Sequence, residues 1–126
     1  IRASDNLAAL RRLGEDPLTL HSTRVATLHG LVDLMDAAAA AAPHLAGRVL
    51  VLYGGKDDLI PRHATRHAWR ALPAGVRIAY YPEGHHLLLR DLDRAIPLGD
   101  ILAWLADPAA PLPSGADFAA RRFLGR

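Results

Sequence analysis

Two residues, Asp57 and His86, have the types and positions needed for general-base chemistry. Asp57 lies in a Gly-rich segment, Tyr53–Pro61, after a short apolar run, and His86 lies in Glu83–Leu89 after the next such run. A carboxylate that accepts the Nδ1–H of an imidazole holds the ring in one tautomer and stabilises the imidazolium formed when Nε2 takes a proton. The pair therefore predicts activation of a hydroxyl nucleophile. Because no Gly-x-Ser-x-Gly occurs in the 126 residues, we expect that nucleophile to come from outside this chain.

The elements that carry these two residues are expected to be neighbouring parallel strands. Arg48–Tyr53 and Val76–Tyr81 are short, nearly continuous apolar runs, which are typical of strands buried on both faces of a parallel sheet. Parallel strands have their carboxyl ends at the same edge of the sheet, and adjacent strands lie about 4.8 Å apart. Asp57 and His86 should therefore lie side by side at that edge, where ligands bind in open α/β sheets.

The rest of the chain is predicted to be largely helical. A first helix, Leu7–Leu13, has Ser4, Asp5 or Asn6 as its cap. Thr23–Ala42 has one apolar stripe and Thr23 as a plausible cap. Three further helices are expected: Arg62–Leu72 with an alanine-rich face, Asp91–Ala106 kinked or broken by Pro97, and a short amphipathic stretch at Ala116–Leu124.

Strands that alternate with helices place the chain in the α/β class. Two strands are too few for an independent sheet, and the chain begins at Ile1 rather than Met, so we expect it to be the end of a larger fold. The predicted division is residues 1–20 as the end of a lid or cap region, residues 21–106 as core, and residues 107–126 as a Pro-rich tail.

Composition excludes several classes of function. The net charge of +2 comes from Arg residues scattered along the chain, which argues against a nucleic-acid partner. The absence of Cys excludes disulfides, thiolate zinc sites and a Cys nucleophile. The longest uninterrupted apolar run, Ala37–Pro43, is far shorter than the roughly 20 residues of a membrane span.

The motifs resemble those of a known family. Val49–Pro61 resembles the strand and loop that carry the triad acid in bacterial lysophospholipase and monoacylglycerol-lipase-like serine hydrolases, and Tyr80–Leu92 is similar to their catalytic-histidine loop. Ser4–Asn6, Asp16–Pro17 and Thr23–Met35 resemble the segment that leaves the lid and re-enters the sheet. This similarity to a serine aminopeptidase-type hydrolase domain runs from about residue 2 to 115. It implies the C-terminal portion of an α/β-hydrolase fold, with two parallel strands and flanking helices.

The resemblance also implies roles and partners. Asp57 is the triad acid and His86 the base, with Asp58 and His85 as the competing assignments. The substrate is a lipid carboxylic ester, a lysophospholipid or monoacylglycerol, and no cofactor or metal is expected. The serine lies on a missing N-terminal half, so this chain alone should be inactive. We expect a cytoplasmic protein with weak membrane-surface contact.

Other interpretations remain open. The chain is alternatively a non-catalytic remnant that binds a partner through an exposed sheet edge, or a peptidase of the same fold. His63 and His67 have the spacing of a metal pair, but a solvated helix face is expected instead. Asp58 is expected to cap the helix after Pro61, and Arg90-Asp91 to form surface charge pairs. Phe118–Leu124 is the segment considered for lipid contact.

Overall fold

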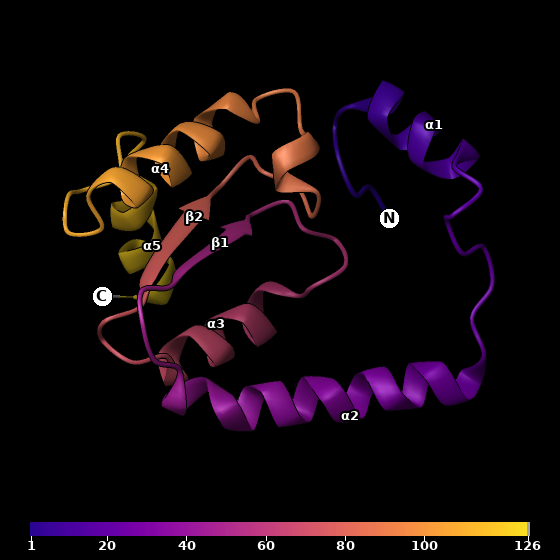
Figure 1. The fold of residues 1–126 in the computed structure, drawn as a ribbon, viewed down its shortest axis with the longest axis horizontal. Helices are drawn as coiled ribbons and strands as arrows, with labels where there is room; N and C mark the ends of the chain where they lie inside the picture. Colours follow the sequence, from indigo (N-terminus) through magenta and orange to yellow (C-terminus); the bar gives the residue numbers. More distant parts are fainter. Residues whose placement is uncertain (126) are drawn as a thin grey trace.

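A two-stranded parallel sheet lies at the centre of the protein, for which a computed structural model describes residues 1–125. Strands β1 (Leu50–Gly54) and β2 (Arg77–Tyr81) pair along their whole length, with Leu50 opposite Arg77 and Gly54 opposite Tyr81. Helix α3 (Arg62–Ala71) connects them, as Figure 1 shows. The predicted α/β class and the parallel pairing are confirmed, and both strands end at the same edge of the sheet.

Side chains of the two strands alternate between two hydrophobic clusters, one on each face of the sheet. On one face, α3 and α5 (Ala116–Leu124) cover the strands. On the other, α4 (Ala95–Ala106) and the segment around Leu112 cover them. The first cluster contains Val51, Tyr53, Trp69, Ile78, Tyr80, Ala120 and Phe123; the second contains Leu50, Leu52, Ala79, Tyr81, Leu112, Ala116 and Trp104.

The C-terminal segment contributes to the core. Helix α5 begins after Gly115, which has the left-handed φ of +74°, and packs along β2. Phe123 is 6% exposed and stacks on Tyr80 with ring centroids 4.5 Å apart. From the sequence, this segment is predicted to be the end of a Pro-rich tail, and Phe118–Leu124 is considered for lipid contact. The structure buries Phe123 and Leu124 instead, because their apolar side chains cover one face of the sheet.

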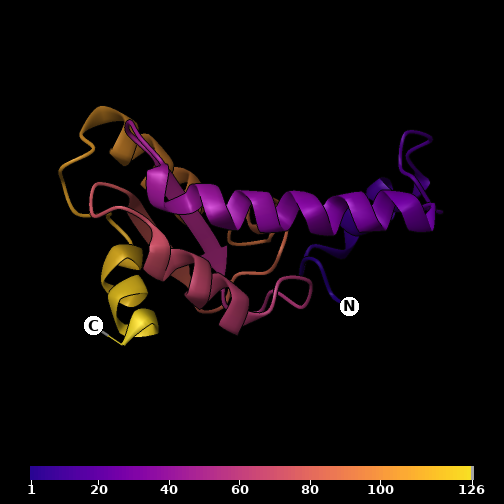
Figure 2. The same cartoon turned by 90° about the horizontal axis from the view of Figure 1, so that it is seen from below.

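Figure 1 shows helix α1 (Leu7–Glu15) beyond the arrowhead ends of the strands and helix α2 (Val25–Ala41) along the bottom of the view, below α3; Figure 2 shows that α2 extends past the sheet. Asn6 is the cap of α1, since its Oδ1 accepts the Ala9 N–H at 3.1 Å. Helix α2 begins at Val25 without a side-chain cap, so the expected capping by Thr23 is wrong. No residue of α2 is buried, and its apolar stripe is therefore open in the structure.

Helix α2 continues into the short 3-10 helix η1 (Ala42–His44), and the combined length matters for whether this segment could span a membrane. In the described part of the chain, Val25–His44 is long and apolar enough to cross a membrane by length and composition alone. The sequence-based expectation that no segment is long enough considered only the uninterrupted apolar run Ala37–Pro43. Polar residues such as Asp33 interrupt such a run, yet the helix as a whole stays apolar on average.

Two further helix predictions are corrected by packing. Helix α3 buries Thr65 and Trp69 rather than the predicted alanine face, because the large indole fills the space over Tyr53. Asp91 does not start a helix; a 3-10 turn, η2 (Leu88–Arg90), precedes it and α4 begins at Ala95. Pro97 lies in the first turn of α4, where its missing N–H costs nothing, so it neither kinks nor breaks the helix.

Candidate active site

Asp57 and His86 meet at the carboxyl edge of the sheet. The loop after β1 carries Asp57, the loop after β2 carries His86, and the Nδ1 atom of His86 lies 2.9 Å from Oδ2 of Asp57. The Asp57 side chain is 5% exposed, whereas the His86 side chain is 35% exposed. Since Nδ1 is engaged by the carboxylate, Nε2 is the nitrogen left for proton exchange with a reacting group.

Glycines allow the two loops to approach this closely. A Cβ on Gly54 would lie 2.5 Å from the carbonyl oxygens of both Gly84 and His85. A Cβ on Gly55 would lie 2.5 Å from the Pro82 carbonyl oxygen. Backbone hydrogen bonds then join the loops, because Lys56 N–H donates to Gly84 O at 2.8 Å and Gly55 N–H donates to Tyr81 O at 2.7 Å. Backbone hydrogen bonds between the two loops therefore hold Asp57 and His86 within contact distance.

The carboxylate of Asp57 is held in its charged form. Its Oδ1 accepts the N–H groups of Leu59 at 2.8 Å and Ile60 at 2.9 Å, while Oδ2 faces His86. Burial by itself raises the pKa of Asp57, but the Ile60 N–H, the His86 ring and the Leu59 N–H outweigh burial and lower it. An ionised Asp57 is the state that orients an imidazole and stabilises its protonated form.

The competing assignments have other partners. Asp58 is exposed, and its Oδ2 accepts the Arg2 N–H at 3.3 Å. The start of α3 has no side-chain cap, so the expected capping by Asp58 is wrong. His85 is buried and its Nδ1 lies 3.3 Å from Oδ2 of Asp91. Of the two Asp and two His candidates, the structure therefore brings together Asp57 and His86.

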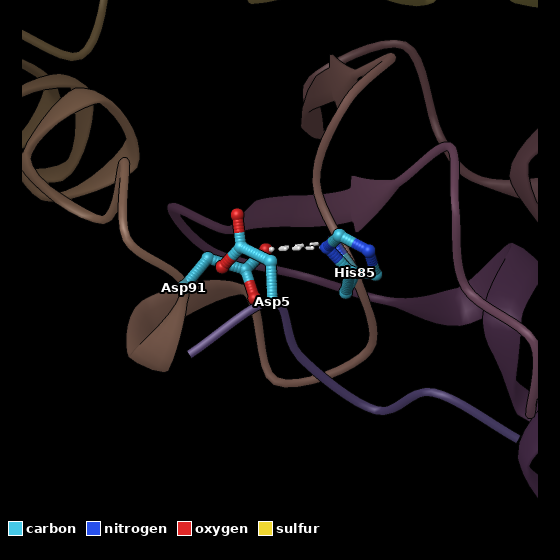
Figure 3. Close-up of side chains that lie close together, drawn as sticks. All are labelled: Asp5, His85 and Asp91. Atoms are coloured by element: carbon cyan, nitrogen blue, oxygen red, sulfur yellow. Dashed lines mark hydrogen bonds and ion pairs between the residues drawn. The ribbon is translucent and has the colours of Figure 1, made fainter. Parts of the chain in front are cut away.

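A second polar cluster brings Asp5, His85 and Asp91 close together (Figure 3). Asp91 accepts hydrogen bonds from the His85 backbone N–H at 2.8 Å and from Ser4 Oγ at 2.6 Å. Ser4 is 0% exposed and Asp91 is 4% exposed. The sequence does not predict this cluster, and Arg90-Asp91 is expected there to form surface charge pairs. Ser4 and Asp91 are 87 positions apart, and no local pattern marks them as partners.

Asp5, His85 and Asp91 are the described residues whose donor atoms are close enough to share a metal ion. The three atoms lie within 4.8 Å of one another. However, both oxygens of Asp91 already accept protein hydrogen bonds, and Oδ1 of Asp5 accepts the Leu92 N–H at 2.8 Å. The carboxylates that could bind a metal ion are therefore already engaged in a hydrogen-bonded network. His63 and His67 lie on the exposed face of α3, as expected.

A shallow cavity of about 300 Å³ opens beside His86. Its lining contains no carboxylate and is mainly leucine. The lining residues are Leu52, Leu87, Leu88, Leu89, His86 and Arg90. A larger cavity of about 450 Å³, lined by Val49 and Val76, lies at the amino ends of the strands and so away from the Asp–His pair. Of these cavities, the one of about 300 Å³ has His86 itself in its lining.

None of the three serines of the chain is hydrogen-bonded to His86 within residues 1–125. Ser4 donates to Asp91, and Ser114 donates to Asp100. Ser22 is exposed in the segment between α1 and α2. These positions agree with the absence of Gly-x-Ser-x-Gly from the sequence.

A parallel sheet flanked by helices, with Asp and then His beyond consecutive strands, is the arrangement of the α/β-hydrolase class. A family model described as serine aminopeptidase, S33, matches residues 1–93, which include both strands and both loops. The chain belongs to this family of α/β-hydrolases. The resemblance to α/β-hydrolases is thus confirmed at the level of the superfamily.

Proposed function

We propose that Asp57 and His86 are the acid and the base of a serine hydrolase that cleaves carboxylic esters of lipids. The observation that carries this proposal is the 2.9 Å contact between His86 Nδ1 and Asp57 Oδ2, which leaves Nε2 free at the edge of the sheet. The serine is proposed to come from a polypeptide segment outside these 126 residues, since none of the three serines here contacts His86.

The chemistry follows from the two side chains. His86 Nε2 takes the proton of the serine hydroxyl as Oγ bonds to the acyl carbon, and Asp57 stabilises the imidazolium. The imidazolium then gives its proton to the leaving alkoxide as the ester C–O bond breaks. In the second half, His86 takes a proton from water as the water oxygen bonds to the acyl carbon. The imidazolium then returns this proton to the serine Oγ as the acyl C–Oγ bond breaks, which releases the carboxylic acid.

The lipid substrate is proposed from the cavity beside His86. Four leucines line it and no carboxylate does, so it suits an acyl chain such as that of a lysophospholipid or monoacylglycerol. This lining carries no negative group for the α-ammonium of an aminopeptidase substrate, whereas a cavity of about 370 Å³ against the same loop includes Glu83 and Asp91. The family's description still makes a peptidase the competing enzymatic proposal.

The test compares the chain alone with the chain fused behind the N-terminal half of a family hydrolase that carries Gly-x-Ser-x-Gly. We expect no turnover by the chain alone and hydrolysis of p-nitrophenyl esters and monoacylglycerols by the fusion. His86→Ala in the fusion should lower kcat by about 10⁴–10⁶-fold, because the serine loses its base. His63→Ala, on an exposed helix face, is the matched control and should keep the full rate.

Three results decide between the proposals. Full activity of the His86→Ala fusion would refute the assignment of the base. Hydrolysis of amino-acid p-nitroanilides in preference to esters would favour the peptidase. A correctly folded fusion without any turnover would favour the non-catalytic binding module, for which the absent nucleophile is the supporting observation.

A further inference from the structure

The loop that carries His86 is tied down on both sides of that residue. Before it, the His85 backbone N–H donates to Asp91 Oδ2 at 2.8 Å. After it, the Leu87 N–H donates to the carbonyl oxygen of Ala3 at 2.8 Å. The backbone of His86 is therefore held between two fixed acceptors, one of them a buried carboxylate.

That carboxylate is itself anchored to the N-terminal segment. Oδ1 of Asp91 accepts the Ser4 hydroxyl at 2.6 Å, and the Ser4 oxygen in turn accepts the Asn6 N–H at 3.1 Å. The same segment contacts the loop again further along, because Asp5 Oδ1 accepts the Leu92 N–H and Asn6 Nδ2 donates to Arg90 O. Residues 3–6 thus hold the His86 loop from outside the sheet.

The His86 ring needs such support because its side chain is only partly buried and Asp57 is its hydrogen-bond partner. It is 35% exposed, and within the described residues its one hydrogen-bond partner is Asp57. A single hydrogen bond leaves an exposed ring free to move with its backbone, and a misplacement of about 1 Å can cost about 10²-fold in rate. A rigid backbone on each side of the residue removes that freedom.

We propose that Asp91 is a positioning residue for His86, acting through the His85 backbone and anchored by Ser4. This inference rests on the proposed role of His86 as the base. Asp91 does not touch the reacting atoms. Its function is to present the His86 imidazole to Asp57 with Nδ1 inward and Nε2 outward.

The charge of Asp91 suits this task. Burial by itself raises the pKa of its carboxyl, but hydrogen bonds from the Ser4 hydroxyl and from the N–H and ring of His85 outweigh burial and lower it. An ionised carboxylate accepts at both oxygens, so it serves Ser4 and His85 together. The His85 ring, 3.3 Å from Oδ2, lies against the same oxygen (Figure 3).

The first test uses residues 1–126 and does not depend on turnover. ¹⁵N NMR of the imidazole nitrogens reports which nitrogen of His86 carries the proton. In the wild type we expect a single Nδ1–H tautomer, and in Asp91→Ala a mixture of the two tautomers. Asp91→Asn should fall between them, because its carbonyl oxygen can still accept from His85 and its amide can donate to Ser4. Ser4→Ala should resemble Asp91→Asn.

Asp100 supplies a matched control. It is also a buried aspartate, 1% exposed, and it accepts hydrogen bonds from Tyr81 Oη at 2.8 Å and from Ser114. Asp100→Ala and Ser114→Ala remove a buried network of the same kind elsewhere and should leave the His86 tautomer unchanged. If the Asp91 and Asp100 variants give the same His86 spectrum as each other, Asp91 is merely structural and the proposal is overturned.

The second test uses the ester-hydrolysing fusion. Asp91→Ala should lower kcat by about 10²-fold with KM nearly unchanged, since binding groups are untouched. Asp91→Asn should restore most of the loss, and Asp100→Ala should retain the wild-type kcat. A wild-type kcat for Asp91→Ala would refute the positioning role. Failure of the base assignment gives a different result, because His86→Ala would then be active whatever Asp91 does.

Discussion

Gly54 is the position where one added methyl group should separate Asp57 from His86. Its Cβ would lie 2.5 Å from two backbone carbonyl oxygens, those of Gly84 and His85. Real Cβ contacts keep at least 3.0 Å, so the loops must part by about 0.5 Å or more. Backbone atoms cannot rotate away as a side chain can. The overpacking should cost about 1–3 kcal/mol of stability.

The assay for Gly54→Ala is urea unfolding followed by the fluorescence of Trp69, which is buried in the core, and of Trp104, which packs against the other face of the sheet. For a slope of about 1–3 kcal/mol per molar urea, the midpoint should fall by about 1 M. The His86 Nδ1–H signal should weaken in the folded chain, and kcat of the fusion should fall by about 10²-fold.

Gly30 and Gly99 provide the controls for this substitution. Both lie in helices, and an added Cβ at either meets nothing within 4 Å. Alanine at these positions should leave His86 unchanged and stabilise the chain by up to about 1 kcal/mol. A Gly54→Ala variant with the wild-type midpoint and an intact Nδ1–H signal would refute the argument that backbone approach creates the contact.

Two further predictions concern acid stability and the C-terminal helix. The folded-state pKa values of Asp57 and Asp91 lie below their ordinary value of 3.8. The stability that these two carboxylates contribute is therefore fully present above pH 3.8, and it is lost as the pH falls through their folded-state pKa values. Urea midpoints measured from about pH 5 to pH 2 should therefore fall less steeply in the Asp57→Asn/Asp91→Asn double variant than in the wild type, and equal slopes would contradict the assignment. Phe123→Ala should cost about 3–5 kcal/mol, because its ring is 6% exposed and stacks on Tyr80. Phe118→Ala, at a position 54% exposed, should change stability by less than about 0.5 kcal/mol, and a similar loss in both variants would mean that α5 is not part of the core.

Local patterns in the sequence predict most of the secondary structure. Apolar runs that end at Gly54 and Pro82 indicate two strands, and both form close to the predicted positions. Helical periodicity predicts α1, α2, α3 and α5, with bounds that differ by one or two residues in most cases. These signals are local because backbone propensity and the alternation of side chains depend on near neighbours in the chain.

Packing partners could not be predicted in the same way. The buried face of α3 is set by how Trp69 fits over Tyr53, and propensity does not favour that face over the alanines. Helix α5 is short and amphipathic in the sequence, yet it closes one face of the sheet. In both cases the choice depends on side chains from other elements.

The sequence by itself determined that an Asp and a His follow consecutive strands, because the apolar runs and the glycine-rich turns are patterns of neighbouring residues. The tertiary structure decided which Asp faces which His, since Asp57 and Asp58, like His85 and His86, differ only in the direction of their side chains. It also decided that Ser4 anchors Asp91 across 87 positions of sequence. Such a contact arises when distant segments are packed together and a buried carboxylate must find a donor, and this requirement has no counterpart in the local pattern.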